Sequence, residues 1–280
     1  MKKKILLFFT LFSINCFSQF SKTHYIPPLT CATNLANDHY LYISTPSNTD
    51  VNFKIIENGG ATITAVVNNT SPYIYAIGQG ENTQLFTPKT SIGIITNKGY
   101  IVEAEDLIYV SVRVNAGFSS QNNSFNHAGG LVSKGNSALG KEFRLGAMLN
   151  PTYDPNLLNF ASILSTENNT KVTISNIPIG SVLSNGTIIT GPITITLGKN
   201  ESYVLALENY SNTISNSSNM IGALVESDKP VVVNSGSFGG SNSTIVNAEG
   251  NPIGRDLGFD QNCSNRKNGK RIYLCKRTWK

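Results

Sequence analysis

The segment Val51-Asn52-Phe53-Lys54-Ile55 alternates apolar and polar side chains, and Ile193-Thr194-Ile195-Thr196-Leu197 does the same. Because successive side chains of a strand point to opposite faces of a sheet, this period of two predicts half-buried β-strands. Turn-forming sequences separate such segments, and no helical period recurs between them. The main ones are Asn58-Gly59-Gly60, Gly198-Lys199-Asn200 and Asn185-Gly186, the last of which predicts a hairpin.

Two further segments are apolar without alternation. They are Val231 to Val233 and Tyr203-Val204-Leu205-Ala206-Leu207. Continuous apolar runs of this length are typical of strands that are buried on both faces. The sequence therefore predicts an all-β protein in which some strands are more deeply covered than others.

Parts of the sequence occur twice. Ser44 to Val51 resembles Ser165 to Val172, and Val102-Glu103-Ala104-Glu105 resembles Val225-Glu226-Ser227-Asp228. Gly140-Lys141-Glu142-Phe143 also resembles Gly254-Arg255-Asp256-Leu257. Matches at similar shifts indicate duplication of one β unit of about 120 residues.

This duplication predicts the domain organisation. Residues 19–139 form a first β repeat unit, residues 140–253 form a second, and residues 254–261 begin a third. We expect tandem antiparallel β-sandwich-like repeats. A β-propeller, in which each repeat supplies two blades, is the alternative architecture.

The N-terminus has the features of a secretory signal peptide over residues 1–18. Lys2 to Lys4 are followed by the apolar run Ile5 to Phe12, which is too short to span a bilayer. We expect cleavage between Ser18 and Gln19. The alternative is a lipoprotein acylated at Cys16. Both interpretations predict export, as a secreted or cell-surface protein, with no later membrane span.

Charge is distributed unevenly along the chain. The net charge is +5, but seven of the 22 basic residues lie in 262–280, a stretch without acidic residues, and three lie in the signal. Without these ten the body has 12 basic and 17 acidic residues. The body therefore has no basic excess to support nucleic-acid binding.

Residues 262–280 also contain the only tryptophan and two of the four cysteines. We interpret this aberrant basic tail as the product of a frameshift in a longer surface protein. A genuine basic tail that binds anionic polymers is the alternative. An open reading frame that resumes one base away across codons 255–280 would support the frameshift, and stop codons in that frame would exclude it.

The sequence contains no recognisable catalytic motif, and we expect no enzyme activity. The possible histidine bases are His24, His39 and His127, and we expect His127 to scaffold its loop. Ser235 and Ser237 lack the spacing of a nucleophile elbow. We expect no cofactor and no metal-ligand set, although weak calcium binding by loop carbonyls stays open.

Cysteines and glycines give no chemistry either. Cys31 is the only cysteine in the body, so a disulfide framework is excluded there and we expect an inert thiol. Gly78-Gln79-Gly80 and Gly236 to Gly240 do not open a predicted helix, so they are turns and not phosphate-binding loops.

A family resemblance points to binding. The segment from His127-Ala128-Gly129-Gly130 to Leu145-Gly146 resembles the N-terminal region of IgGFc-binding proteins, as do Ser227 to Val233 and Gly254 to Gly258. The signal followed by His24 to Leu29 is similar to gliding-motility-associated surface proteins of Bacteroidota. The resemblance implies a secreted or cell-surface adhesion module that engages a glycan, a glycoprotein or another surface protein, and it does not imply binding to immunoglobulin Fc.

The ligand-binding residues are unknown from the sequence. Abundant Tyr, Asn and Thr residues suit a carbohydrate-type surface, because aromatic faces offer stacking platforms. An exported glycan hydrolase is the alternative function. Such an enzyme would present paired carboxylates about 5 to 10 Å apart in one groove.

Overall fold

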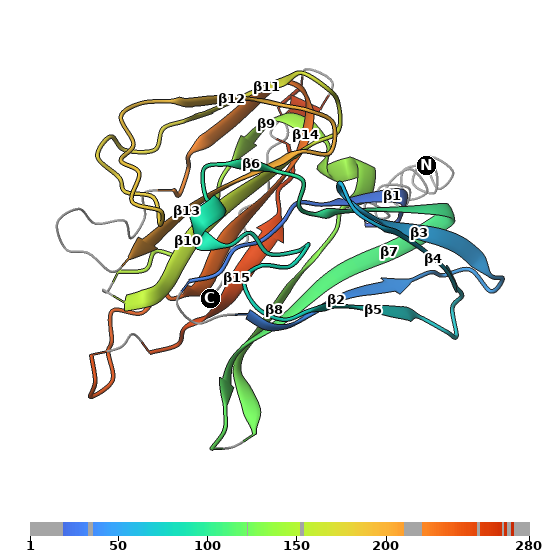
Figure 1. Ribbon diagram of the computed structural model, residues 1–280, viewed down its shortest axis with the longest axis horizontal. Helices are drawn as coiled ribbons and strands as arrows, with labels where there is room; N and C mark the ends of the chain where they lie inside the picture. The colour runs from blue at the N-terminus through green and yellow to red at the C-terminus, as the bar shows by residue number, and fades with distance from the viewer. Residues whose placement is uncertain are drawn as a thin grey trace, which may run out of the picture.

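The computed structural model describes residues 19–32, 36–121, 123–151, 154–209, 220–250, 253–264, 266–267 and 270–271. Strands dominate this part, which otherwise contains two short 3-10 turns, η1 (Lys89–Ser91) and η2 (Gly135–Ala138). No helix in these ranges is both long and apolar enough to cross a bilayer. The all-β prediction is confirmed, with two curled antiparallel sheets in a sandwich-like arrangement (Figure 1).

The first sheet has seven strands arranged around the long strand β7. Its strands are β1 (Ser21–Ile26), β2 (Ala36–Ser44), β3 (Val51–Glu57), β4 (Thr62–Val67), β5 (Tyr73–Gly78), β7 (Tyr100–Ser119) and β8 (Ser124–Val132). The N-terminal half of β7 pairs with β1 and β3, and its C-terminal half pairs with β2 and β8. β4 extends the first half-sheet, and β5 extends the second.

The two half-sheets curl toward each other. Phe53 of β3 meets Tyr73 of β5 at a ring-centroid distance of 5.3 Å. Tyr75 of β5 meets Tyr100 of β7 at 6.1 Å. Side chains from both half-sheets thus share one interior, which gives the sheet its sandwich-like, nearly barrel-shaped curl.

The second sheet has eight strands arranged around β14. They are β6 (Ile95–Thr96), β9 (Gly140–Arg144), β10 (Asp154–Ser165), β11 (Thr170–Ser175), β12 (Ile193–Leu197), β13 (Ser202–Asn209), β14 (Leu224–Gly240) and β15 (Asp256–Gln261). A separate pair, β16 (Arg266–Lys267) and β17 (Lys270–Arg271), lies beyond it.

The two sheets have the same strand order. β12-β11-β14-β10-β13 corresponds to β4-β3-β7-β2-β5, while β9 and β15 occupy the places of β1 and β8. Side-chain contacts agree: the hydroxyl of Thr45 donates to the carbonyl of Leu107 at 2.7 Å, and that of Thr166 donates to the carbonyl of Pro230 at 3.0 Å. We refer to residues 19–139 as the first unit and to residues 140–261 as the second.

Residues 254–261, which we expected to begin a third unit, contribute β15. This strand pairs with the C-terminal half of β14 in the second sheet. β8 has the equivalent position along β7. In each sheet the C-terminal half of the long central strand has an edge at which this strand pairs. The sequence from Gly254 to Leu257 resembles that of β9, but the two segments do not have equivalent places in the fold. β9 pairs with the N-terminal half of β14.

Most predicted strands and turns lie at their expected positions. Gly236 to Gly240, which we predicted as a turn, instead lies in β14, where Gly236 allows close approach of the β15 backbone. Val51 to Ile55 lies in β3 and Ile193 to Leu197 forms β12. Gly59 has a φ of 72° between β3 and β4, and Asn200 has a φ of 66° between β12 and β13. At Asn185-Gly186 the chain forms the predicted tight turn, with an antiparallel bridge from Val182 to Ile188. The N–H of Leu183 donates to the carbonyl of Thr187 and that of Ile189 donates to the carbonyl of Ser181, each at 2.8 Å.

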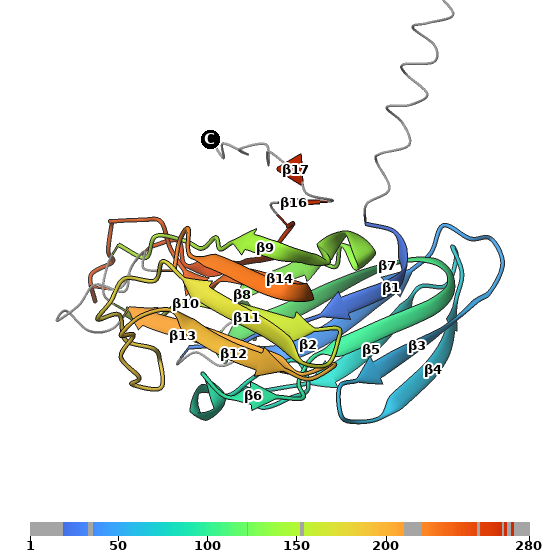
Figure 2. The same ribbon diagram turned by 90° about the horizontal axis from the view of Figure 1, so that it is seen from above.

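The second unit is covered more completely than the first. The strand segments Val231 to Val233 and Tyr203 to Leu207 are buried at every position, which confirms burial on both faces. Part of this cover comes from the first unit, because β6 pairs with Ser202 and Tyr203 at the edge of β13. Figure 2 shows β6 next to its partner strand β13, on the side of the second unit.

Candidate functional site

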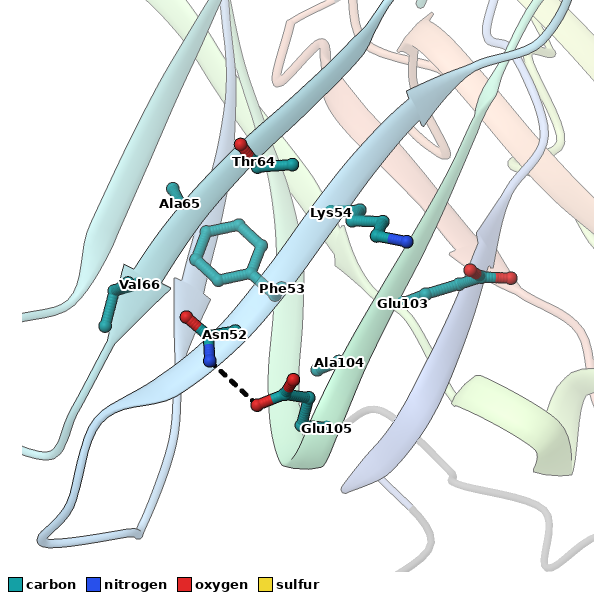
Figure 3. Close-up of a pocket in the computed structure, with 9 residues that line it drawn as sticks. All are labelled: Asn52, Phe53, Lys54, Thr64, Ala65, Val66, Glu103, Ala104 and Glu105. Atoms are coloured by element: carbon teal, nitrogen blue, oxygen red, sulfur yellow. Dashed lines mark hydrogen bonds between the residues drawn. The ribbon is translucent and has the colours of Figure 1, made fainter.

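A shallow groove lies on the outer face of β4, β3 and the N-terminal half of β7 (Figure 3). Its volume is about 540 Å³, and it is lined by Asn52, Phe53, Lys54, Thr64, Ala65, Val66, Glu103, Ala104 and Glu105. The alternation that identified β3 also places these groups: Asn52 and Lys54 are exposed, whereas Phe53 between them is buried in the interior. The groove floor is therefore a polar sheet surface with side chains standing on it.

Donors and acceptors alternate across this surface. The amide of Asn52 donates to Glu105 Oε2 at 2.8 Å. Lys54 lies opposite Glu103 in the strand pairing, and Thr64 lies opposite Lys54 on the other side. Neighbouring strands thus present an amide, an ammonium and a hydroxyl beside two carboxylates.

An aromatic side chain lies beside the groove on β1. Tyr25 pairs with Ile101 and is half-buried. Burial raises its pKa, and the charge of Glu103 raises it further. The phenol is therefore protonated at neutral pH and offers both a hydroxyl donor and an aromatic face.

The second unit repeats the acidic pair. Glu226 and Asp228 are exposed on β14, where the register places them as Glu103 and Glu105 are placed on β7. Lys171 donates its backbone N–H to Asp228 Oδ1 at 2.8 Å, much as Asn52 contacts Glu105. The hydroxyls of Thr173 and Thr194 lie 3.3 Å apart across the next strands.

The glutamate pair bears on the hydrolase alternative. Glu103 and Glu105 are two residues apart on one strand, so their Cα atoms are about 7 Å apart. The range of about 5 to 10 Å for a glycosidase applies to the carboxyl groups themselves. However, both are exposed and stand side by side on one strand, not on opposite walls around a bond. Since the general acid of a glycosidase is kept protonated by an apolar pocket, this arrangement suits hydrogen bonding better than acid catalysis.

The histidines do not form a catalytic pair with the serines considered above. His24 is buried with Nε2 3.0 Å from the carbonyl of Ile108, and burial lowers its pKa. Burial also lowers the pKa of His39 to about 4. His127, which we expected in a loop, instead lies on strand β8 and is half-buried. The hydroxyl of Ser237 contacts Asn159 at 2.6 Å, and that of Ser235 contacts Asn262 at 2.9 Å.

Cysteine and metal chemistry are also unsupported in the described residues. Cys31 is buried, and burial raises its pKa to about 12, so the thiol stays protonated. Within the described ranges, no group of three or more His, Cys, Asp or Glu could hold a metal ion. Cys16 with the signal segment 1–18, and the tail residues 265, 268–269 and 272–280, lie outside the described residues.

The comparison with protein families identifies the chain. The family described as IgGFc binding protein matches residues 129–278, more than half of the sequence. This chain belongs to the IgGFc-binding protein family. The matched range covers the second unit and most of the basic tail that we interpreted as frameshifted. No curated protein and no solved structure matches the chain.

Membership defines the general class of this protein. The family consists of binding modules and is not a known enzyme family. Its domains are typically extracellular, and the family implies a protein partner. The groove was missed from the sequence, although Asn52, Lys54, Glu103 and Glu105 could have been recognised as the outward positions of alternating strands.

Proposed function

We propose that this IgGFc-binding family member is a secreted or cell-surface adhesion module that binds a glycan or glycoprotein on the outer faces of its two units. The observation that carries this proposal is the repeated polar face, with Glu103 and Glu105 in the first unit and Glu226 and Asp228 in the second. Sugar hydroxyls donate to carboxylates and accept from amides and ammonium groups, so such a face matches their chemistry. Tyr25 adds a stacking surface at one side.

Two equivalent faces on one chain also provide bivalency. A ligand that reaches both faces binds the second one intramolecularly, which raises avidity without any new contact. This advantage requires a ligand with repeated determinants. A glycan chain or a glycoprotein with several glycans satisfies that requirement.

The shared strand order supports duplication of one unit, and it favours a revised boundary. We propose that the first unit covers residues 19–139 and the second covers 140–261, because β15 completes the second sheet as β8 completes the first. Residues 1–18 are proposed as the signal peptide. N-terminal sequencing of the exported protein tests this: Gln19 is expected, whereas an acylated Cys16 would establish the lipoprotein alternative.

The binding proposal is tested on glycan and glycoprotein arrays with labelled protein. We expect wild-type binding that falls at least about tenfold in Glu103→Gln/Glu105→Gln, since each lost charged hydrogen bond costs about 1.5–3 kcal/mol. Glu249→Gln is the control, because it removes an exposed carboxylate that does not line the groove. Binding that is unchanged in the double variant would place the ligand elsewhere.

The same samples distinguish the competing functions. Release of reducing sugar by the wild type, lost in the double variant, would establish the glycan hydrolase. Immobilised Fc fragments, with and without their glycans, test whether the activity named in the family description applies to this chain. Equal binding to both forms would show that the ligand is a protein epitope and not the glycan.

A further inference from the structure

The outer face of the second unit's C-terminal half-sheet is buried under the first unit. Asn234 Nδ2 donates to the carbonyl of Pro27 at 3.1 Å, and Phe238 meets Phe86 at 6.0 Å. Glu208 accepts from Lys89 at 2.6 Å. The face is thus covered by two connections of the first unit, the one after β1 and the one between β5 and β7. Its other fully buried members are Phe160, Ser162, Leu164, Val204, Ala206 and Val232.

Hydrogen bonds identify the equivalent face of the first unit. The carbonyl of Val110 accepts from the N–H of Ser133 after β8, and that of Val233 accepts from Asn262 after β15. Because carbonyl and side-chain directions are coupled in a strand, Val110 and Val233 point to the same side of their sheets. The next residues, Ser111 and Asn234, therefore both point outward.

The strand pairing extends this equivalence to a full row. Ser111 lies opposite Tyr42, which lies opposite Ile74. Asn234 lies opposite Ser162, which lies opposite Val204. Tyr42 is 37% exposed and Ile74 is 53% exposed, whereas Ser162 and Val204 are at most 1% exposed. On β2 and β5 the first unit therefore leaves apolar side chains uncovered on the face that the second unit buries, while Ser111 on β7 is 3% exposed.

The connections that correspond to each other in the two units differ in the opposite sense. In the first unit, the connection after β1 carries Leu29, which is fully buried and exchanges backbone hydrogen bonds with the Leu85 to Thr87 segment. In the second unit, the connection after β9 carries Leu149, which is 51% exposed. Ile221, just before β14, is 39% exposed. Among the described residues, the second unit thus exposes Leu149 and Ile221, which lie on the counterparts of the two connections with which the first unit makes its contact.

We propose that the outer face of β5, β2 and the C-terminal half of β7 is an interaction surface for a second copy of this chain, docked head to tail. Leu149 and Ile221 of one copy's second unit cover Tyr42 and Ile74 of the next copy. The contact repeats the interface that joins the two units within the chain. Because it uses different surfaces on each copy, it is heterologous and builds open chains.

The self-association is tested by sedimentation velocity over a concentration series of the exported protein. We expect the wild type to form dimers and longer species as concentration rises. Ile74→Glu and Leu149→Glu each place a charge in the contact and weaken association at least about tenfold. Val66→Glu, an equally exposed apolar position on β4, is the matched control and should associate like the wild type.

A mixing experiment tests the head-to-tail geometry. Ile74→Glu retains an intact second-unit surface, and Leu149→Glu retains an intact first-unit face. An equimolar mixture should therefore form heterodimers but no longer species, while each variant alone stays monomeric. Circular dichroism confirms that the variants are folded.

Three outcomes would overturn the proposal. The first is a wild type that is monomeric at all concentrations, and the second is an equal loss in the Val66→Glu control. The third is a mixture that stays monomeric although the wild type associates, which would indicate a symmetric contact. Binding of glycans to the Tyr42 face in a monomeric protein would assign that face to ligand recognition instead.

Discussion

The two units have one strand order but opposite relations to solvent. In the second unit, β10 and β13 are buried on both faces. β13 carries the apolar run Tyr203 to Leu207, whereas β10 also buries Asn159, Ser162 and Ser165. In the first unit, β2 and β5 alternate, and Tyr42 and Ile74 reach solvent. The comparison shows that strand order determines the curl of each unit. The outward-facing side chains instead differ according to whether another part of the protein covers them.

The largest expected difference is at a pair of equivalent positions on the central strands. Phe238 is 1% exposed and packs on Phe86. Asn115 occupies the equivalent position in the first unit, because it follows Ser111 by four residues just as Phe238 follows Asn234. Asn115 lies on the open face. We expect Phe238→Ala to lower the free energy of unfolding by about 3–5 kcal/mol. Asn115→Ala should change it by less than about 1 kcal/mol. Urea unfolding measures both, and equal losses would break the comparison.

The ion pair between the units gives the next effect. Burial raises the pKa of Glu208, and the ammonium of Lys89 opposes that rise. Lys89→Met removes the partner of a carboxylate whose side chain is 2% exposed, so we expect a loss of about 3 kcal/mol in unfolding free energy. The control is Lys22→Met, because Lys22 and Asp106 are both exposed, and it should be nearly neutral. Similar effects of the two variants would show that the burial of Glu208 is unimportant.

Acid should weaken the first unit selectively. All three histidines lie in it, and the place of His39 is taken by Asn159 in the second unit. The folded pKa of His39, about 4, is below its unfolded value of 6.5, so the neutral form stabilises the fold above pH 6.5. That contribution, on the order of 2–3 kcal/mol, is lost as the pH falls from 6.5 toward 4, and His24 adds to it in the same direction.

Hydrogen exchange at pH 7 and pH 4.5 resolves this effect by unit. We expect protection to fall in β2 and β7 more than in β10 and β14. His39→Gln removes the titrating group and should flatten the pH dependence of the first unit. A loss that is equal in both units would assign acid sensitivity to carboxylates instead.

The smallest effect is expected on the open face. Ile74→Thr should change the unfolding free energy of the monomer by about 0.5 kcal/mol or less, because Ile74 is more than half exposed. Val204→Thr, at the equivalent covered position, places a hydroxyl in the inter-unit contact and should cost about 1–3 kcal/mol. Thermal melts at low protein concentration compare the two. A larger loss for Ile74→Thr would mean that its face is already covered within the monomer.

The sequence by itself determined the strands and much of their burial. Alternation located β3 and β12, and the apolar run Val231 to Val233 indicated burial on both faces, because side-chain period and hydrophobicity are local properties. The turns at Gly59 and Asn200 were also predictable, since few residues adopt a positive φ.

Tertiary structure decided which strands became neighbours. β15 joins the second sheet because β14 offers it an edge, and Asn185 supports a turn because its amide donates to the carbonyl of Ile92 in the first unit. Asn185 and Ile92 are 93 residues apart in the sequence. The groove likewise exists only because β3, β4 and β7 bring Lys54, Thr64 and Glu103 side by side. Strand pairing is non-local, so a pattern along the chain predicts which face of a strand is apolar but not what lies against it.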